Sequence, residues 1–163
     1  MNEKNKITDI WSTRVQFDYK RANPTALKIN GYENDRELWI NAITQHEMCL
    51  ELRNRLQGKT IIGHNPKFDM DFIIEAWRVN GMSKPKYDHR LIDTMVLCHY
   101  HLDFLGMSLS LDTIRKFFGW TLDGSHTATK DVNDTAKLYR KMMKAGRLHR
   151  MKWIISYLIR LSI

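Results

Sequence analysis

Two short segments of this chain carry residue types that can do hydrolytic chemistry. Residues 63–69 read Gly-His-Asn-Pro-Lys-Phe-Asp, and residues 125–131 read Ser-His-Thr-Ala-Thr-Lys-Asp. In the second segment His126 precedes Asp131 by five positions, so an imidazole on a loop can lie beside a carboxylate on the first turn of a helix. A neutral histidine can take a proton from water near pH 7, and an aspartate supplies the hard oxygen ligand that Mg²⁺ or Mn²⁺ prefers. The pair therefore suits a general base beside a metal ligand.

Each segment also has a purely structural interpretation. Asp69 lies near the start of a predicted helix, where the helix dipole favours an ionised carboxylate and where aspartate is a common cap. His64 and Asn65 can satisfy backbone groups in the same turn. His126 and Asp131 can likewise be an exposed imidazole and the start of a capped helix. Taken singly, neither segment decides between structure and chemistry.

The elements around these segments alternate between strands and helices. Residues 60–63, Thr-Ile-Ile-Gly, form the β-branched run that is typical of a buried strand, and a helix is predicted from about residue 69 to 79. Residues 89–92 predict another strand, which leads directly into a helix over 94–100. Open α/β sheets place their sites in loops that follow the strands, so the segment 63–69 is well placed for function.

The rest of the chain fits the same α/β class. Alternating apolar and polar residues predict a half-buried strand over residues 11–19. One or two helices are expected between Asp35 and Leu56. Further helices are predicted over residues 110–118, 129–144 and 148–161. At 163 residues, with no linker or internal repeat, the sequence predicts a single domain over 1–163.

In this order and spacing, the two segments resemble the DEDDh family of 3′-to-5′ exonucleases. The family's second motif looks like His-Asn-x-x-Phe-Asp, and its third looks like His-x4-Asp at the start of a helix. Asp-Thr and the apolar helix of residues 93–97, the leucine-rich helix of 109–118 and the segment 26–32 are similar to the family as well. The resemblance covers residues 11–144 and implies a ribonuclease H-like fold, a mixed sheet flanked by helices.

The resemblance implies two-metal cleavage of phosphodiester bonds at the single-stranded 3′ end of a nucleic acid, with Mg²⁺ or Mn²⁺ as the ions. In that scheme Asp69 and Asp131 are carboxylates of the metal site, and His126 deprotonates the attacking water. The residues implied to line the pocket for the terminal nucleotide are His64, Asn65 and Phe68.

The family's first motif, an Asp-x-Glu on the opening strand, has no counterpart in the expected place. Asp35-Arg36-Glu37 has the spacing but follows the predicted strand that it should precede. Asp71 and Asp134 are expected to be solvated helix residues. The two-metal site is therefore expected to be incomplete and the N-terminal strand or strands to be missing, either in a truncated exonuclease or in a degenerate relative that no longer cuts.

The charge of the chain favours an anionic partner. Its 26 Lys and Arg exceed its 18 Asp and Glu by 8, and from Lys130 to Ile163 nine basic residues face two acids. These side chains can follow a phosphate backbone, or they can be the solvated face of the last two helices. Two cysteines far apart in sequence indicate neither a disulfide framework nor a zinc site, and with no apolar leader they favour a cytoplasmic setting.

The C-terminal residues 147–163 are basic and apolar. Trp153–Ile163 is too short to span a membrane and carries Arg160, so we expect a packing helix, or a contact with a partner or a second copy, rather than a membrane contact. The leading functional hypothesis is a 3′-to-5′ exonuclease that depends on Mg²⁺ or Mn²⁺, and the sequence leaves open whether DNA or RNA is its substrate. The alternatives are a catalytically inactive nucleic-acid-binding remnant of the same fold, and a small interaction protein that acts through its C-terminal helix.

Overall fold

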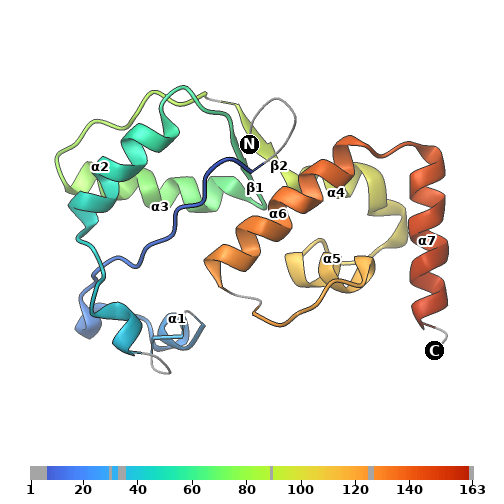
Figure 1. The fold of residues 1–163 in the computed structure, drawn as a ribbon, viewed down its shortest axis with the longest axis horizontal. Helices are drawn as coiled ribbons and strands as arrows, with labels where there is room; N and C mark the ends of the chain where they lie inside the picture. Colours follow the sequence, from blue (N-terminus) through green and yellow to red (C-terminus); the bar gives the residue numbers. More distant parts are fainter. Residues whose placement is uncertain (1–6, 30, 33–35, 89, 125–126, 162–163) are drawn as a thin grey trace. The chain divides into compact units, whose positions relative to one another are not determined.

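A computed structural model describes residues 7–29, 31–32, 36–88, 90–124 and 127–161 (Figure 1). The chain divides into two compact units. Unit 1 holds the residues up to Ile61 together with Lys67–Leu91, and unit 2 holds Ile62–Pro66 together with Ile92–Ile163. Two short strands and the helices of both units make the chain a mixed α/β protein, as the sequence predicts.

The sheet is a parallel pair of strands joined by a helix. Strands β1 (Ile61–Gly63) and β2 (Leu91–Asp93) are neighbours, and α3 (Pro66–Val79) lies between them in the sequence. Just before the strands, the Gly58 amide donates to the Lys86 carbonyl at 2.8 Å and the Asp88 amide donates to the Lys59 carbonyl at 2.9 Å. Both partners advance in the same direction, which is the pairing of parallel strands.

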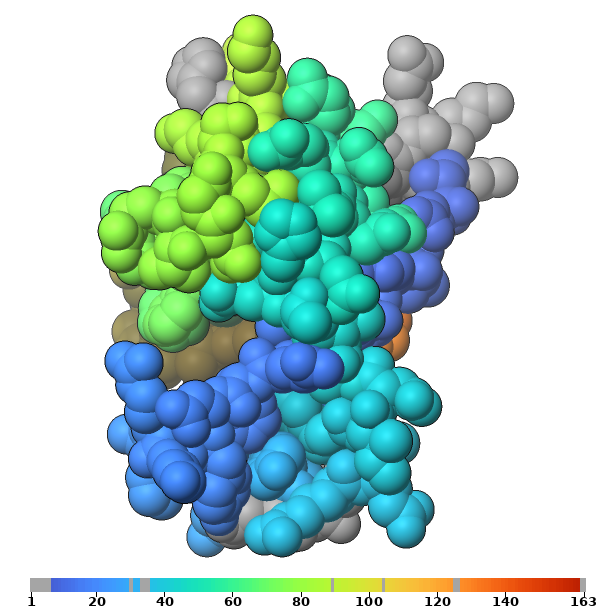
Figure 2. Space-filling view, turned by 90° about the vertical axis from the view of Figure 1, so that its left-hand side faces the viewer, coloured from blue at the N-terminus to red at the C-terminus, as the bar shows by residue number. Residues whose placement is uncertain are grey.

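Helices α2 (Gln45–Leu56) and α3 form the core of unit 1. Helix α2 begins with a capping box, in which Thr44 and Glu47 satisfy each other's backbone amides. In the space-filling view, α2 (teal) lies beside the segment 80–88 (lime green), where the Arg53 guanidinium donates to the Ser83 carbonyl at 2.8 Å (Figure 2). The buried residues of this core are Cys49, Ala76 and Trp77, packed against Met48, Leu52, Leu56, Ile73 and Met82.

The predicted strand over residues 11–19 is reduced to one parallel bridge, between Val15 and Ile43. The Gln16 amide donates to the Ile43 carbonyl, and the Ile43 amide donates to the Arg14 carbonyl, both at 2.9 Å. The ladder ends there because the partner segment turns into α2 at Gln45. The alternation of apolar and polar residues over 11–19 predicts a strand but does not say which strand would pair with it. This part of the chain instead holds the short helices η1 (Tyr19–Arg21), α1 (Pro24–Ile29) and η2 (Arg36–Trp39).

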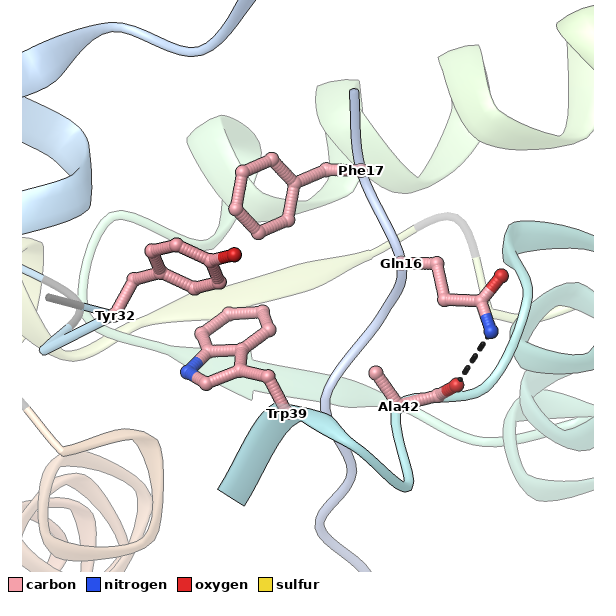
Figure 3. Close-up of a pocket in the computed structure, with 5 residues that line it drawn as sticks. All are labelled: Gln16, Phe17, Tyr32, Trp39 and Ala42. Atoms are coloured by element: carbon pink, nitrogen blue, oxygen red, sulfur yellow. Dashed lines mark hydrogen bonds between the residues drawn. The ribbon is translucent and has the colours of Figure 1, made fainter. Parts of the chain in front are cut away.

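The aromatic residues of that segment pack together instead of lining one face of a strand. The rings of Phe17, Tyr32 and Trp39 meet edge to face, with centroids 5.0 to 5.4 Å apart (Figure 3). Beside them the Gln16 side-chain amide donates to the Ala42 carbonyl at 2.9 Å. This cluster replaces the sheet contacts that a strand would have made.

Unit 2 is a helical layer that follows β2. Its elements are α4 (Thr94–Leu102), η3 (Asp103–Leu105), α5 (Leu111–Phe118), α6 (Ala128–Met143) and α7 (Arg147–Leu161). Helix α4 packs against α6, and α5 packs against α7 (Figure 1). The fully buried residues of this core are Cys98, Leu102, Ile114, Phe117, Leu138 and Met142.

Helix α7 uses one side to pack within its own unit. The Tyr157 ring lies 4.9 Å from Phe117, and the Trp153 ring lies 5.3 Å from Phe118, centroid to centroid. The packing role predicted for this helix is therefore present, while a role in binding a partner stays a prediction. No helix in the described residues is long and apolar enough to cross a membrane. The apolar residues of α7 that remain exposed are Leu148, Met151, Ile155, Leu158, Ile159 and Leu161.

Leu138 and Met143 make a matched pair for testing this core, because both lie on α6 but only Leu138 is buried. We expect Leu138→Ala to lower the free energy of unfolding by about 3 kcal/mol, through lost burial and the cavity left behind. Met143→Ala should change it by less than about 0.5 kcal/mol. Urea unfolding followed by circular dichroism measures both, and equal losses would contradict this core.

Candidate active site

The loop after β1 is a sharp turn that only certain residues can make. A Cβ atom on Gly63 would lie 2.6 Å from the Cβ atom of Pro66, so any larger residue would force the loop away from the start of α3. Asn65 adopts a positive φ of 64°, in the left-handed region that asparagine tolerates better than most residues. The turn therefore fixes where the His64 side chain leaves the strand.

His64 is held by hydrogen bonds at both ring nitrogens. Nε2 lies 2.7 Å from the Leu109 carbonyl, and Nδ1 lies 2.9 Å from the Thr94 hydroxyl. A carbonyl can only accept, so Nε2 carries a proton. Burial lowers the pKa of His64 and favours the neutral ring. Nδ1 lies beside the Thr94 hydroxyl, whose proton is donated to the Gly63 carbonyl at 3.0 Å. His64 thus joins the loop after β1 to the start of α4 and to the segment before α5.

Asp93 makes a second connection between the same loops. One oxygen, Oδ1, accepts from the Asn65 amide at 3.0 Å and from the Met95 amide at 2.8 Å. Asp93 is therefore both the N-cap of α4 and a clamp on the loop after β1. The Asp-Thr pair at 93–94 matched the exonuclease pattern in sequence, and the structure gives both side chains a positioning role.

Asp69 and Phe68 lie on the first two turns of α3, which begins at Pro66, three residues earlier than predicted. Pro66 suits this place because its missing N–H has no partner at a helix start. The Phe68 side chain is 59% exposed and meets Phe72 edge to face at 5.0 Å. Protein atoms that exclude water from its carboxylate raise the pKa of Asp69, although the residue as a whole is exposed. Its neighbour Asp71 is exposed, as predicted, and its carboxylate pairs with Lys67.

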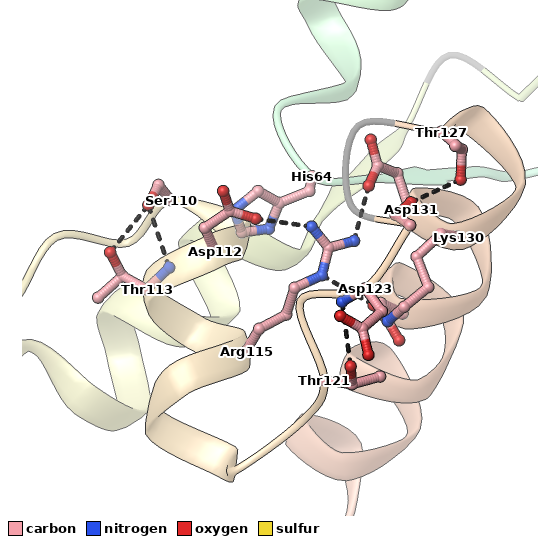
Figure 4. A network of polar contacts seen from close by, with 12 residues as sticks. His64, Ser110, Asp112, Thr113, Arg115, Thr121, Asp123, Thr127, Lys130 and Asp131 are labelled. Carbon is pink, nitrogen blue, oxygen red and sulfur yellow. Dashed lines mark hydrogen bonds and ion pairs between the residues drawn. The ribbon is translucent and has the colours of Figure 1, made fainter.

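Asp131 lies on the first turn of α6, where its carboxylate is bound by a buried arginine (Figure 4). The Arg115 guanidinium is 1% exposed and donates to Asp131 at 2.6 Å, to Asp112 at 2.8 Å and to Asp134 at 2.8 Å. The Asp131 side chain itself is 38% exposed. Asp134 is buried, so its prediction as a solvated residue was wrong, because Arg115 and Lys130 supply the charge that its carboxylate needs.

These contacts set the ionisation of the cluster. Burial alone would lower the pKa of Arg115, but its three carboxylate partners raise it. Burial likewise opposes ionisation of Asp134, yet hydrogen bonds from Lys130 and Arg115 lower its pKa. Sequence analysis did not single out Arg115. The sequence does place this arginine next to Ile114, on the apolar side of a predicted helix. A buried arginine needs acidic partners nearby, so this position could have indicated the cluster.

The described residues do not fit a two-ion site. In the part of the chain that the structure describes, no group of three His, Cys, Asp or Glu side chains could hold a metal ion. The carboxylate of Asp131 is bound by Arg115 instead. The predicted general base, His126, and Asp35 of the only Asp-x-Glu in the sequence lie outside the described residues.

Some of the basic side chains of α6 pack on aromatic rings. The Lys137 ammonium lies 4.0 Å from the centre of the Trp120 ring, and that of Lys141 lies 4.7 Å from Phe118. Burial lowers the pKa of Lys141. These two lysines therefore serve packing as well as charge. Other basic residues nearby in the sequence are exposed, namely Lys144 directly after α6, and Arg147 and Lys152 in α7.

Comparison with known proteins identifies similar chains. The model of the Exonuclease family, RNase T, matches residues 2–139. A DNA polymerase III PolC-type of Pediococcus pentosaceus is 28% identical over 108 residues, which are 66% of this chain and 7% of that protein. A 3′-5′ exonuclease DinG of Staphylococcus haemolyticus is 31% identical over 99 residues, 59% of this chain and 10% of that protein. The chain thus spans a small fraction of the length of these relatives.

His64 predicts a pH dependence of stability. Its pKa is lower in the folded protein than the ordinary value of 6.5, so below about pH 6.5 the unfolded chain binds a proton that the folded chain resists. The free energy of unfolding should therefore fall as the pH drops from 7.5 to 5.5. The fall should be smaller in His64→Gln, whose side-chain amide can still donate to Leu109.

Urea unfolding at the two pH values measures this difference. His101 also has a pKa lowered by burial, but it is present in both proteins and cancels in the comparison. Identical pH dependence in the two proteins would show that His64 is not the neutral, buried group described here.

Proposed function

We propose, because this chain belongs to the RNase T family of exonucleases, that it acts as a 3′-to-5′ exonuclease on the single-stranded 3′ ends of nucleic acids. The observation that carries the proposal is the position of the Asp131 carboxylate. Asp131 lies on the first turn of α6, five residues after His126, and its carboxylate is held by Arg115 yet reaches solvent. The exonuclease name of the DinG relative supports the same reaction.

In this proposal the terminal nucleotide lies against the loop after β1 and the start of α3. The exposed Phe68 ring offers a face on which the terminal base can stack. Asn65 is exposed and offers an amide for hydrogen bonds. Both ring nitrogens of His64 are occupied, so we assign it to holding the loop and to contact with the nucleotide through its ring carbons.

The proposed reaction is hydrolysis of the last phosphodiester bond. His126 takes a proton from a water molecule whose oxygen attacks the phosphorus. The bond from phosphorus to the 3′ oxygen of the preceding nucleotide breaks, and that oxygen takes up a proton. The products are a nucleoside 5′-monophosphate and a chain one nucleotide shorter. By the resemblance, Asp69 and Asp131 would be the carboxylates for Mg²⁺ or Mn²⁺, but the described donors do not fit a pair of ions.

We infer that the substrate is DNA. The names of two relatives connect them with DNA synthesis, namely the PolC-type DNA polymerases III of Pediococcus pentosaceus and Listeria innocua. Such a substrate would give the chain a role in DNA replication or repair. Comparing single-stranded DNA with RNA of the same sequence tests this part of the proposal.

A second candidate function is binding of nucleic acid without cleavage. The ion pair between Arg115 and Asp131 favours it, because a carboxylate neutralised by a fixed cation has less charge to offer a metal ion. The exposed basic residues of α6 and α7 would then carry the affinity. Binding of this kind is independent of sequence and weakens with salt.

The exonuclease proposal predicts that two substitutions abolish shortening of a 5′-labelled single-stranded DNA. With Mn²⁺ present, Asp131→Asn and His126→Ala should each lower the rate by about 100-fold or more, since each removes a group from the reacting centre. Asp112→Asn is the matched control, because it also touches Arg115 but has no assigned role. Equal residual cleavage by all four proteins would exclude catalysis by this chain.

The binding candidate predicts that affinity survives without catalysis. Fluorescence anisotropy with labelled single-stranded DNA in EDTA should show affinity that falls as KCl rises, by a log–log slope of about 0.7 per phosphate contact. The double substitution Lys144→Gln and Arg147→Gln should weaken binding and reduce that slope. The double substitution Lys59→Gln and Lys84→Gln, at two exposed lysines of unit 1, is the charge-matched control. Affinity that does not change with salt would contradict the basic surface.

A further inference from the structure

One buried cation in unit 2 is surrounded by three carboxylates. The guanidinium of Arg115 donates through Nε to Asp134, through Nη1 to Asp112 and through Nη2 to Asp131, at 2.8, 2.8 and 2.6 Å. Its side chain is 1% exposed. A charge buried this deeply is tolerated only when it is paired and hydrogen-bonded, and Arg115 meets that condition at all three nitrogens.

The cluster is close to electrically balanced. Asp112, Asp131 and Asp134 contribute three negative charges, while Arg115 and Lys130, which also contacts Asp134, contribute two positive charges. A divalent ion binds where carboxylate charge is not yet compensated. Arg115 Nη2 already occupies the Oδ1 side of the Asp131 carboxylate.

We propose that Arg115 is the resident cation of the Asp131 carboxylate and competes with divalent ions for it. While Arg115 is in place, Mg²⁺ or Mn²⁺ binds at Asp131 weakly, because the ion meets a neutralised carboxylate and a like charge beside it. This inference rests on the proposed function only in treating Asp131 as a carboxylate of the site. It goes further, because it says what this carboxylate binds.

Arg115 cannot easily give way to an incoming ion. Swinging its guanidinium away from Asp131 would also break the contacts with Asp112 and Asp134, and of the two described cations that contact Asp134 it would leave Lys130. The three hydrogen bonds therefore together hold the guanidinium, and breaking one requires breaking the others. A further consequence is that the junction of α5 and α6 needs no metal ion to keep its acids together.

Titration with Mn²⁺ tests the competition directly, with no nucleic acid present and free Mn²⁺ read by electron paramagnetic resonance. Arg115→Gln removes the charge, and we expect it to bind Mn²⁺ at least about tenfold more tightly than the parent chain. Arg115→Lys keeps a cation and should stay close to the parent. Adding Asp131→Asn to Arg115→Gln should remove the gain.

The expected gain requires a folded variant, so circular dichroism and urea unfolding accompany each titration. If Arg115→Gln fails to fold, Arg115→Gln with Asp134→Asn removes the buried cation together with a buried anion and should still bind Mn²⁺ more tightly than the parent. No gain in a folded variant would overturn the proposal. So would tight Mn²⁺ binding by the parent chain that Asp131→Asn abolishes.

The result is independent of the exonuclease assay, because the titration measures ion binding and not turnover. A chain that cuts no DNA but gains Mn²⁺ affinity on loss of Arg115 would refute the exonuclease proposal and support the resident cation. If the chain cuts DNA and the Arg115 variants bind Mn²⁺ no more tightly than the parent, the exonuclease proposal is supported and the resident cation is refuted.

Discussion

The guanidinium of Arg115 is the charge on which the arrangement of unit 2 depends. It joins α5 to the first two turns of α6, and its partners among the described residues are acids on those helices. Without it, Asp131 and the buried Asp134 would lie near each other, and Lys130 would be the cation among the described residues that still contacts Asp134. Burying one arginine among three aspartates thus turns a set of mutually repelling acids into a fixed junction, and places Asp131 at its solvent side.

A second set of polar contacts positions the loop after β1. His64, Thr94 and Asp93 connect that loop to the start of α4 and to the segment before α5. The loop of residues 64–66 and Asp131 belong to the same unit, while Phe68 and Asp69 belong to the other. The contacts of His64 and Asp93 and those of Arg115 thus both lie within unit 2.

Local patterns were enough to predict the two strands of the sheet and the helices that follow them, but not the elements before residue 45. The β-branched run at 60–63 and the apolar spacing of 110–118 predicted β1 and α5, because burial and helix ends leave local traces in sequence. The strand over 11–19 failed because a ladder needs a partner, and its partner at Ile43 is followed at once by a helix. The Arg115 cluster could not be predicted from spacing, since Asp131 and Asp134 lie 16 and 19 residues away. The roles of Asp69, Asp131 and His126 came from the family resemblance and remain predictions.

The central claim is that a fixed arginine, and not a metal ion, is the cation at Asp131. The most direct measurement is an anomalous difference map from crystals of this chain soaked in Mn²⁺, because it locates the ion and the guanidinium in one experiment. The account predicts Arg115 in contact with Asp112, Asp131 and Asp134, with no manganese peak at the Asp131 carboxylate. A manganese ion bound to Asp131, with the guanidinium displaced from it, would contradict the account.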